Sequence, residues 1–353
     1  MAKTYAERLE NLEKRRIDPD LILEKSAVEK FSVNEMLKEA YTKLDEVDVY
    51  KYFIGAMQPV DGVYTRNTYA EAERIQNQLD KIKESNFDFS YEYQGSVSNN
   101  THIKAHSDID ILVLINKFFT LEPPQEPSNP YKGNPINDLL ELREKCERHL
   151  KSAFHAATVD CSGAKSISLS GGSLRRKIDV VPSNWYDTVR YSDTCNKIYR
   201  GVQVLDKYKR ERIKNTPFYH NYLIDVKDNA CHLNFKRTIR LLKNLKADAE
   251  VDIKFSSYDI VAVLYHMDNL KYFVGDKYLM LLKNVKEHLE FVINSSLFQS
   301  NKSVPDNSRL IFDSPDKLNE LKKLKYEIDS LYVDVMEELN SNGMIIDKKV
   351  FVI

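Results

Sequence analysis

Residues 94–115 read QGSVSNNTHIKAHSDIDILVLI, and this stretch decides the fold class. From Ile109 onward it is almost entirely apolar and rich in β-branched residues, which is typical of a central strand buried on both faces. Asp108 and Asp110 stand at the start of that strand, where alternate residues point to the same face. The sequence therefore predicts a buried strand that carries two carboxylates side by side at its beginning.

The pair of aspartates suggests a cation site. Two carboxylates on one face repel each other unless a cation lies between them. Hard divalent cations such as Mg²⁺ prefer oxygen ligands of this kind. The alternative is a pair of strand-edge aspartates that remain in solvent, and the Asp-x-Asp pattern taken alone does not separate the two.

Gly95 and Ser96 close the preceding segment, FDFSYEYQ at 87–94, whose alternation of aromatic and polar residues predicts a strand. A glycine at this point lets the backbone approach a ligand closely. Exposed N–H groups beside a serine can hold phosphate oxygens. Because Gly-Ser turns are common, this pair indicates a phosphate site only through its place before the two aspartates.

Asp179 lies within RRKIDVVPS at 175–183, another apolar segment with strand character. An unpaired charge inside such a strand is costly. A metal ion shared with the first two aspartates would supply the missing partner. The alternative is an ion pair with one of the basic residues just before it: Arg175, Arg176 or Lys177.

The rest of the chain divides into helical ends and a mixed middle. In the N-terminal part, apolar residues at helical spacing predict helices at 3–15, 33–57 and 64–85. Ser32 and Glu35 form a candidate capping box at the start of the helix predicted at 33–57. After a proline-rich loop at 120–135, helical and strand patterns follow at 136–154, 165–170, 175–183 and 201–208. From Asp228 onward, helical patterns cover 235–246, 256–267, 277–294 and 315–340, and the last nine residues are a short strand or a tail.

Composition excludes several classes of protein. The 353 residues have a formal net charge of −1. The chain therefore lacks the overall excess of basic residues that is typical of nucleic-acid-binding proteins. Basic clusters at 207–214 and 236–246 could bind a polyanion, although a solvated helix face explains both. The four cysteines lack zinc-finger spacing, and neither a signal peptide nor a run of about 18 apolar residues is present. We therefore expect a cytoplasmic protein with reduced cysteines and no membrane span.

The motif at 94–114, followed much later by KIDVV at 177–181, resembles the polymerase β-type nucleotidyltransferase superfamily. Within it, the chain is most similar to the CD-NTases, the group of cyclic GMP-AMP synthase, oligoadenylate synthase and bacterial dinucleotide cyclases. IRLLK at 239–243 and KFSSYDIVAVLYHM at 254–267 are similar to the family's C-terminal lobe, and the resemblance covers roughly residues 88–268. It implies that Lys243 and Ser257 hold a triphosphate and that Tyr258 stacks on a base. Without it, these three could be a surface lysine, a helix cap and a core tyrosine.

The resemblance also implies a fold and its division. We expect an α+β protein with a polymerase β-like palm, built on a mixed sheet, and a helical C-terminal lobe. The N-terminal helices at 1–86 would pack across both lobes. The palm would span residues 87–225, and the nucleotide-binding lobe would span residues 226–353.

The implied activity is template-independent nucleotidyl transfer. Nucleoside triphosphates, ATP among them, would be joined into a cyclic di- or trinucleotide second messenger with release of pyrophosphate, as in bacterial anti-phage (CBASS) signalling. Asp108, Asp110 and Asp179 would hold two Mg²⁺ or Mn²⁺ ions, with the triphosphate on Gly95 and Ser96. Alternatives are a linear oligoadenylate synthase, transfer to RNA or another acceptor, and a nucleotide-binding module without catalysis.

Regulation is expected to differ from that of the animal enzyme. The His/Cys insertion that binds zinc in animal cyclic GMP-AMP synthase is missing from this sequence, so we expect neither zinc nor activation by DNA or RNA. The C-terminal residues Phe351, Val352 and Ile353 are a candidate contact for CBASS regulatory proteins, because some bacterial relatives are regulated through their C-termini.

Overall fold

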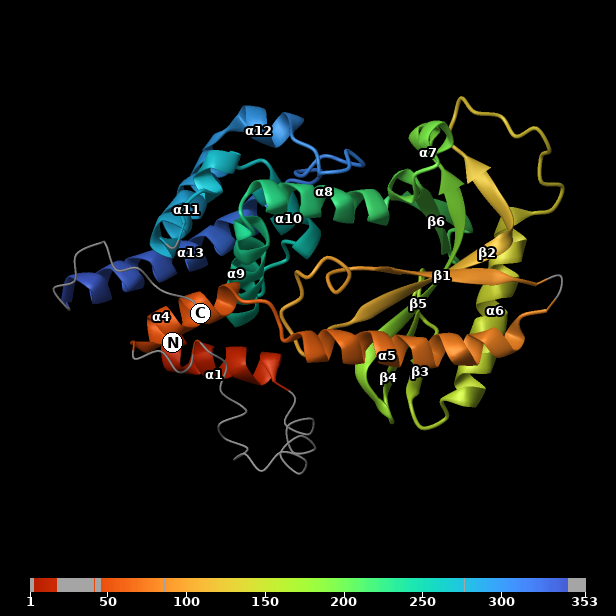
Figure 1. Ribbon diagram of the computed structural model, residues 1–353, viewed down its shortest axis with the longest axis horizontal. Helices are drawn as coiled ribbons and strands as arrows, with labels where there is room; N and C mark the ends of the chain where they lie inside the picture. The colour runs from red at the N-terminus through yellow and green to blue at the C-terminus, as the bar shows by residue number, and fades with distance from the viewer. Residues whose placement is uncertain (1–2, 18–40, 42–45, 85–86, 276, 342–353) are drawn as a thin grey trace. The chain divides into compact units, whose positions relative to one another are not determined.

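The computed structural model describes residues 3–17, 41, 46–84, 87–275 and 277–341. The chain forms two compact units (Figure 1). Unit 1 takes Met1–Val60, Thr101–Ala105 and Ile224–Ile353, and unit 2 takes Asp61–Asn100 and His106–Leu223. The chain therefore passes from unit 2 into unit 1 and back within the loop between the glycine turn and the paired aspartates.

The described residues of unit 2 form a seven-stranded sheet in the order β1-β2-β5-β4-β3, with β6 paired to β5 and β7 to β6. β2 and β5 are parallel, and the other pairs are antiparallel, so the sheet is mixed as expected. The strands are β1 Phe89–Gln94, β2 Ile109–Leu121, β3 Thr158–Asp160, β4 Ile167–Gly171, β5 Leu174–Asp187, β6 Gly201–Asp206 and β7 Glu211–Asn215.

Both faces of β2 are covered by apolar side chains. Ile109, Ile111 and Val113 share a cluster with residues of helices α5 (Gly62–Leu79) and α6 (Pro135–Ala153). The alternate residues, Leu112 and Leu114, belong to a second cluster on the other face. The prediction of a strand buried on both faces is confirmed. Asp110 shares its side of the strand with Leu112, so it faces away from α5 and α6.

Helices α5 and α6 begin where their sequences supply caps. The Asp61 carboxylate accepts a hydrogen bond from the Val63 N–H, and the Asn134 side chain accepts from two N–H groups of the first turn of α6. Pro135 occupies the first helical position of α6, where its missing N–H costs nothing.

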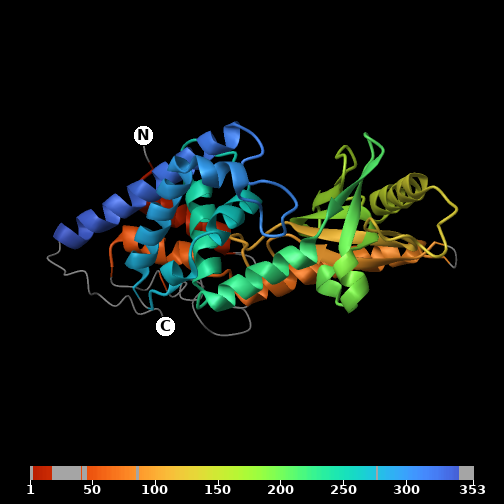
Figure 2. The same cartoon turned by 90° about the horizontal axis from the view of Figure 1, so that it is seen from above.

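Unit 1 is helical (Figure 2). Its helix α9 contacts α1, α4, α10 and α13. Its helices are α1 Tyr5–Arg16, α4 Asp48–Met57, α9 Asn234–Asp248, α10 Ser257–Tyr265, α11 Tyr278–Asn294, α12 Ser296–Asn301 and α13 Asp316–Ser341. Helix α8 (Pro217–Ala230) carries the chain from unit 2 into unit 1, and α7 (Val189–Thr194) belongs to unit 2. In the part of the chain that the structure describes, no helix is long and apolar enough to cross a membrane.

Two expectations about charged segments are wrong. Residues 207–214 form a turn followed by β7, because the segment pairs with β6 in the sheet. Residues 236–246 are helical, but the helix is not a solvated face, since Arg240 and Lys243 are buried in it. The four cysteines are free, as their spacing predicts.

Other predictions fall partly outside the described residues. The predicted helix at 33–57 is described over Asp48–Met57 as α4, whereas its capping box at Ser32 and Glu35 lies outside, as does the C-terminal tail. The three-part division at residues 86 and 225 stays a prediction. Of the N-terminal helices, α1 and α4 belong to unit 1 and α5 to unit 2.

Candidate active site

Asp110 and Asp179 are neighbours across the parallel pair β2 and β5. The register places Asp110 opposite Asp179 and Ile109 opposite Ile178. Asp108 immediately precedes β2 and is exposed, whereas Asp110 and Asp179 are half-buried. Strand pairing thus brings together carboxylates that are far apart in the sequence.

The surroundings of Asp110 disfavour its charged form. Burial raises the pKa of Asp110 to about 6, and the charges of Asp179 and Asp108 add to the rise, while Lys177 opposes it. Gln94, which lies opposite Asp110 in the β1–β2 register, accepts a hydrogen bond of 3.1 Å from the Asn215 amide. A cation at this place would stabilise the carboxylate that burial and its neighbours disfavour.

Asp179 has one partner among the described residues. The Lys177 ammonium donates a 2.9 Å hydrogen bond to Asp179 Oδ2, while the buried Oδ1 has no hydrogen-bond partner there. Of the three basic residues considered as its structural partner, Lys177 is therefore the one that pairs. Arg176 instead forms an ion pair of 2.9 Å with Glu71 of α5, on the other face of the sheet.

The donor set suits a hard divalent cation. All three side chains offer carboxylate oxygens, and Asp179 Oδ1 is a buried acceptor that still lacks a donor in the described structure. Within the described ranges, no three His, Cys, Asp or Glu side chains are already gathered around one point in a way that could hold a metal ion.

Gly95 brings the backbone against Asp110. Its φ of +96° lies in the left-handed region, and a Cβ at this position would stand 3.4 Å from Asp110 Oδ2. Ser96 follows in the turn and is half-buried. The predicted phosphate-binding turn and the carboxylate are therefore direct neighbours.

Hydrogen bonds organise the residues after this turn. Ser98 Oγ donates to the Gly95 carbonyl at 2.7 Å, and the Asn221 amide of α8 donates to Ser98 Oγ at 2.9 Å. Asn99 in turn donates to Asn221 Oδ1 at 3.1 Å. Sequence reasoning missed Asn221, because nothing local in α8 connects it to a loop more than a hundred residues earlier.

Lys243 belongs to unit 1, where its ammonium is buried and donates a 2.7 Å hydrogen bond to the Thr101 carbonyl. Burial, together with the positive charges of Arg240, Lys246 and Lys104, lowers the pKa of Lys243 to about 8. The alternative of a solvated surface lysine is wrong.

Ser257 and Tyr258 also lie in unit 1, at the start of α10, which packs against α9. Ser257 is exposed, and the cap of this helix is Ser256, whose Oγ accepts from the Asp259 N–H at 3.1 Å. The Tyr258 hydroxyl donates to Asp306 Oδ1 at 2.9 Å, and its ring is partly buried against the core of unit 1.

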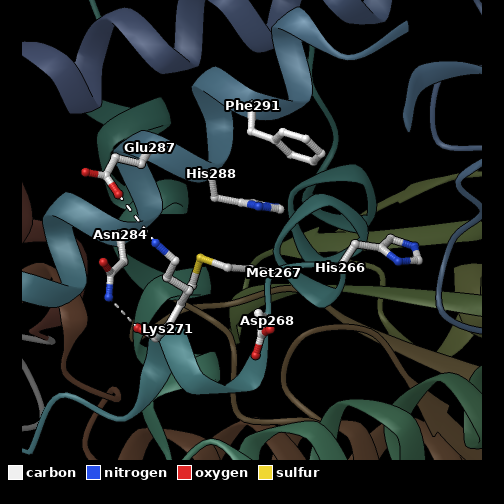
Figure 3. Close-up of a pocket in the computed structure, with 8 residues that line it drawn as sticks. All are labelled: His266, Met267, Asp268, Lys271, Asn284, Glu287, His288 and Phe291. Carbon is white, nitrogen blue, oxygen red and sulfur yellow. Dashed lines mark hydrogen bonds and ion pairs between the residues drawn. The ribbon is translucent and has the colours of Figure 1, made fainter. Parts of the chain in front are cut away.

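A cavity of about 350 Å³ lies elsewhere in unit 1 and contains none of the predicted site residues (Figure 3). Its lining residues are His266, Met267, Asp268, Lys271, Asn284, Glu287, His288 and Phe291. Burial lowers the pKa of His288 to about 4, and its Nε2 lies 2.9 Å from the Val263 carbonyl, so the ring is neutral and donates from Nε2.

The buried neutral His288 predicts a loss of stability in acid. Between pH 6.5 and 4 the unfolded chain binds a proton that the folded His288 does not, so stability falls as the pH falls through this range. We expect about 1 to 2 kcal/mol less free energy of unfolding at pH 5 than at pH 7 from this group. Urea unfolding of wild type and His288→Gln at both pH values measures it; an identical pH dependence in the two proteins would contradict the assignment.

Comparison with known proteins identifies the family. The model of the cGAS/DncV-like nucleotidyltransferase C-terminal helical domain matches residues 223–332. Cyclic dinucleotide synthase CdnE of Yersinia aleksiciae is 39% identical over 297 residues, 82% of this chain and 77% of that protein. A c-di-GMP synthase of Capnocytophaga granulosa is 32% identical over 363 residues, 96% of this chain and 99% of that protein.

Solved structures extend this likeness to three dimensions. The STING-associated CdnE c-di-GMP synthase from Capnocytophaga granulosa superposes with a TM-score of 0.76 at 29% identity, covering 95% of this chain and 99% of its own. The STING-associated enzyme from Flavobacteriaceae sp. gives 0.77 at 28% identity, covering 96% and 100%. Because these likenesses cover nearly its whole length, the chain belongs to the CD-NTase family of nucleotidyltransferases.

Proposed function

We propose that this protein is a cyclic dinucleotide synthase that joins nucleoside triphosphates without a template and releases pyrophosphate. The observation that carries the proposal is the pairing of Asp110 with Asp179 across β2 and β5, directly beside the Gly95 turn. Relatives that match nearly the whole chain are c-di-GMP synthases, which favours GTP among the substrates.

The carboxylates would hold the metal ions and Asp179 would also serve in proton transfer. Asp108, Asp110 and Asp179 are the proposed ligands of two Mg²⁺ or Mn²⁺ ions, which when bound would neutralise the triphosphate and lower the pKa of the attacking hydroxyl. The buried Oδ1 of Asp179 is an acceptor that could take the ribose proton. The N–H groups of the turn at Gly95 and Ser96 would orient the phosphate chain, and orientation accounts for much of the rate in phosphoryl transfer.

Lys243, Ser257 and Tyr258 are proposed to bind the nucleotide, the first two at the triphosphate and the third at the base. A phosphate near Lys243 would favour its charged form, which burial disfavours in the free protein. The exposed start of α10 offers N–H groups and the positive end of the helix dipole to an anion.

Replacing Lys243 with methionine should raise the KM for nucleotide and lower kcat/KM by about tenfold to a hundredfold. This change corresponds to the loss of one charge-assisted hydrogen bond, which contributes about 1.5 to 3 kcal/mol. Lys246→Met is the matched control, since Lys246 is on the same helix and its ammonium also donates to a backbone carbonyl, that of Phe255 at 2.8 Å. Steady-state kinetics with melting curves test this. Equal kcat/KM in the two variants would remove Lys243 from the site.

Transfer to RNA is less well supported than cyclisation. Within the basic segment 207–214, Lys207 donates to the Cys161 carbonyl, and Arg210 donates to Asn137 Oδ1 at 2.9 Å. Arg212 donates to Thr120 Oγ1 at 2.7 Å, and Lys214 pairs with Glu122. These basic side chains therefore form hydrogen bonds and an ion pair within unit 2, and the contacts do not support a surface that binds RNA.

The direct test is product analysis. The purified protein is incubated with the four radiolabelled ribonucleotides and Mg²⁺ or Mn²⁺, the mixture is treated with phosphatase, and the products are separated. A phosphatase-resistant product that disappears in Asp108→Ala supports the proposal and identifies the bases. Phosphatase-sensitive oligomers would instead indicate a linear synthase. CBASS signalling, and regulation through the C-terminal residues, remain proposals to be tested with partner proteins.

A further inference from the structure

We propose that Lys177 is a built-in counter-cation of the carboxylate site, which pairs with Asp179 when no divalent cation is bound and must leave it when one binds. The inference rests on the proposed cation site. It adds a residue that competes with the metal ion and sets the affinity for it.

The first argument is position. Lys177 and Asp179 are two residues apart on β5, so their side chains share one face, the face that also carries Asp110 on the neighbouring strand. The Lys177 ammonium lies 2.9 Å from Asp179 Oδ2. Its charge therefore stands at the same carboxylate that a divalent cation would use.

The second argument is that the pair can open. The Lys177 side chain is 45% exposed, whereas that of Asp179 is 15% exposed. An ammonium on a flexible four-carbon stem that is partly in water can swing away from the carboxylate, because water solvates the charge where the stem reaches it. The half-buried carboxylate of Asp179 then remains in place with both oxygens available.

The third argument comes from the neighbouring arginine. Arg176 points to the opposite face, is buried, and is held by Glu71 of α5 at 2.9 Å. It is part of the packing between helix and sheet and cannot serve as a movable charge at the site. Of the three basic residues at 175–177, all of them described, Lys177 has the contact with Asp179 and the exposure that a displaceable cation requires.

The fourth argument is electrostatic. Three carboxylates with no cation repel one another, and one ammonium among them relieves part of that repulsion. With a divalent cation bound, the same ammonium is a like charge close by and opposes binding. Lys177 should thus stabilise the metal-free protein and weaken metal binding at the same time.

The test measures Mn²⁺ binding to the full chain without nucleotide, from the electron paramagnetic resonance signal of free Mn²⁺. Lys177→Met should bind Mn²⁺ about threefold to tenfold more tightly than wild type, and Lys177→Arg should stay near wild type because it keeps the charge. Lys209→Met is the matched control, since Lys209 is an exposed lysine 3.5 Å from a carboxylate of Glu211 in the β6–β7 hairpin.

A second readout separates this role from simple packing. In EDTA, the Lys177→Met protein should melt at a lower temperature than wild type, and saturating Mn²⁺ should close the gap. Equal or weaker Mn²⁺ binding by Lys177→Met overturns the role of the lysine while leaving the cation site standing. If wild type binds no Mn²⁺, or if Asp179→Asn binds it as wild type does, the proposed cation site itself fails.

Discussion

Replacing Asp179 with asparagine should lower kcat by on the order of 10³-fold, because a carboxylate that holds a catalytic metal ion contributes several kcal/mol to the transition state. The substitution keeps the shape of the side chain, removes its charge and replaces one acceptor oxygen with an NH2 donor. Asp110→Asn should have an effect of similar size, since Asp110 lies opposite Asp179 in the strand register. Pyrophosphate release under saturating nucleotide and Mg²⁺ is the measurement.

The control for this experiment is Asp193→Asn, the same change at an exposed position of α7 in the same unit. It should leave kcat unchanged. Circular dichroism melting should show that all three variants fold. A folded Asp179→Asn protein with wild-type turnover would contradict the assignment of this residue to the catalytic centre.

Replacing Gly95 with alanine should lower kcat/KM about tenfold to a hundredfold, because a small displacement of reacting groups is expensive in transfer reactions. Two effects act together. The φ of +96° strains any residue with a Cβ, and that Cβ would stand 3.4 Å from Asp110 Oδ2, in the space where phosphate is expected to approach. The effect on kcat/KM should therefore be larger than the loss in free energy of unfolding alone would explain.

Gly171→Ala separates the two effects. Gly171 also has a positive φ, +74°, but nothing lies within 4 Å of a Cβ built there. The Gly171→Ala variant has the strain of a Cβ at a positive φ but places no atom near the site. It should therefore be less stable than wild type and keep the wild-type kcat/KM. If Gly95→Ala and Gly171→Ala have the same kcat/KM, the close approach of Gly95 to Asp110 has no part in catalysis.

Local pattern was enough to find the strand that carries the paired aspartates. The apolar run after Ile109 predicts a strand buried on both faces, and the burial of Leu112 and Leu114 on one face and of Ile111 and Val113 on the other agrees. The local sequence did not predict where that strand ends. It continues through a register shift to Leu121, because β5 supplies partners as far as Asp187.

The basic segment at 207–214 shows where local reasoning fails. Its charges suggested a solvated helix, yet it is a turn and β7, because the edge of β6 offers backbone hydrogen bonds. The partners of Arg212 and Lys214, which are Thr120 and Glu122, lie some ninety residues earlier in the chain. Nothing in the local sequence predicts a partner at that distance.

The candidate site divides in the same way. Residue type and local spacing made Asp108, Asp110, Asp179 and the Gly95 turn candidates, because a charge within an apolar strand is costly without a partner and a glycine lets the backbone approach a ligand closely. The choice of Lys177 rather than Arg176 as the partner of Asp179, and of Asn221 as a support for the loop, came only from the folded chain. These partners depend on which face of β5 each side chain occupies and on which distant helix packs against the loop. Strand register and packing determine both, whereas local spacing in the sequence does not.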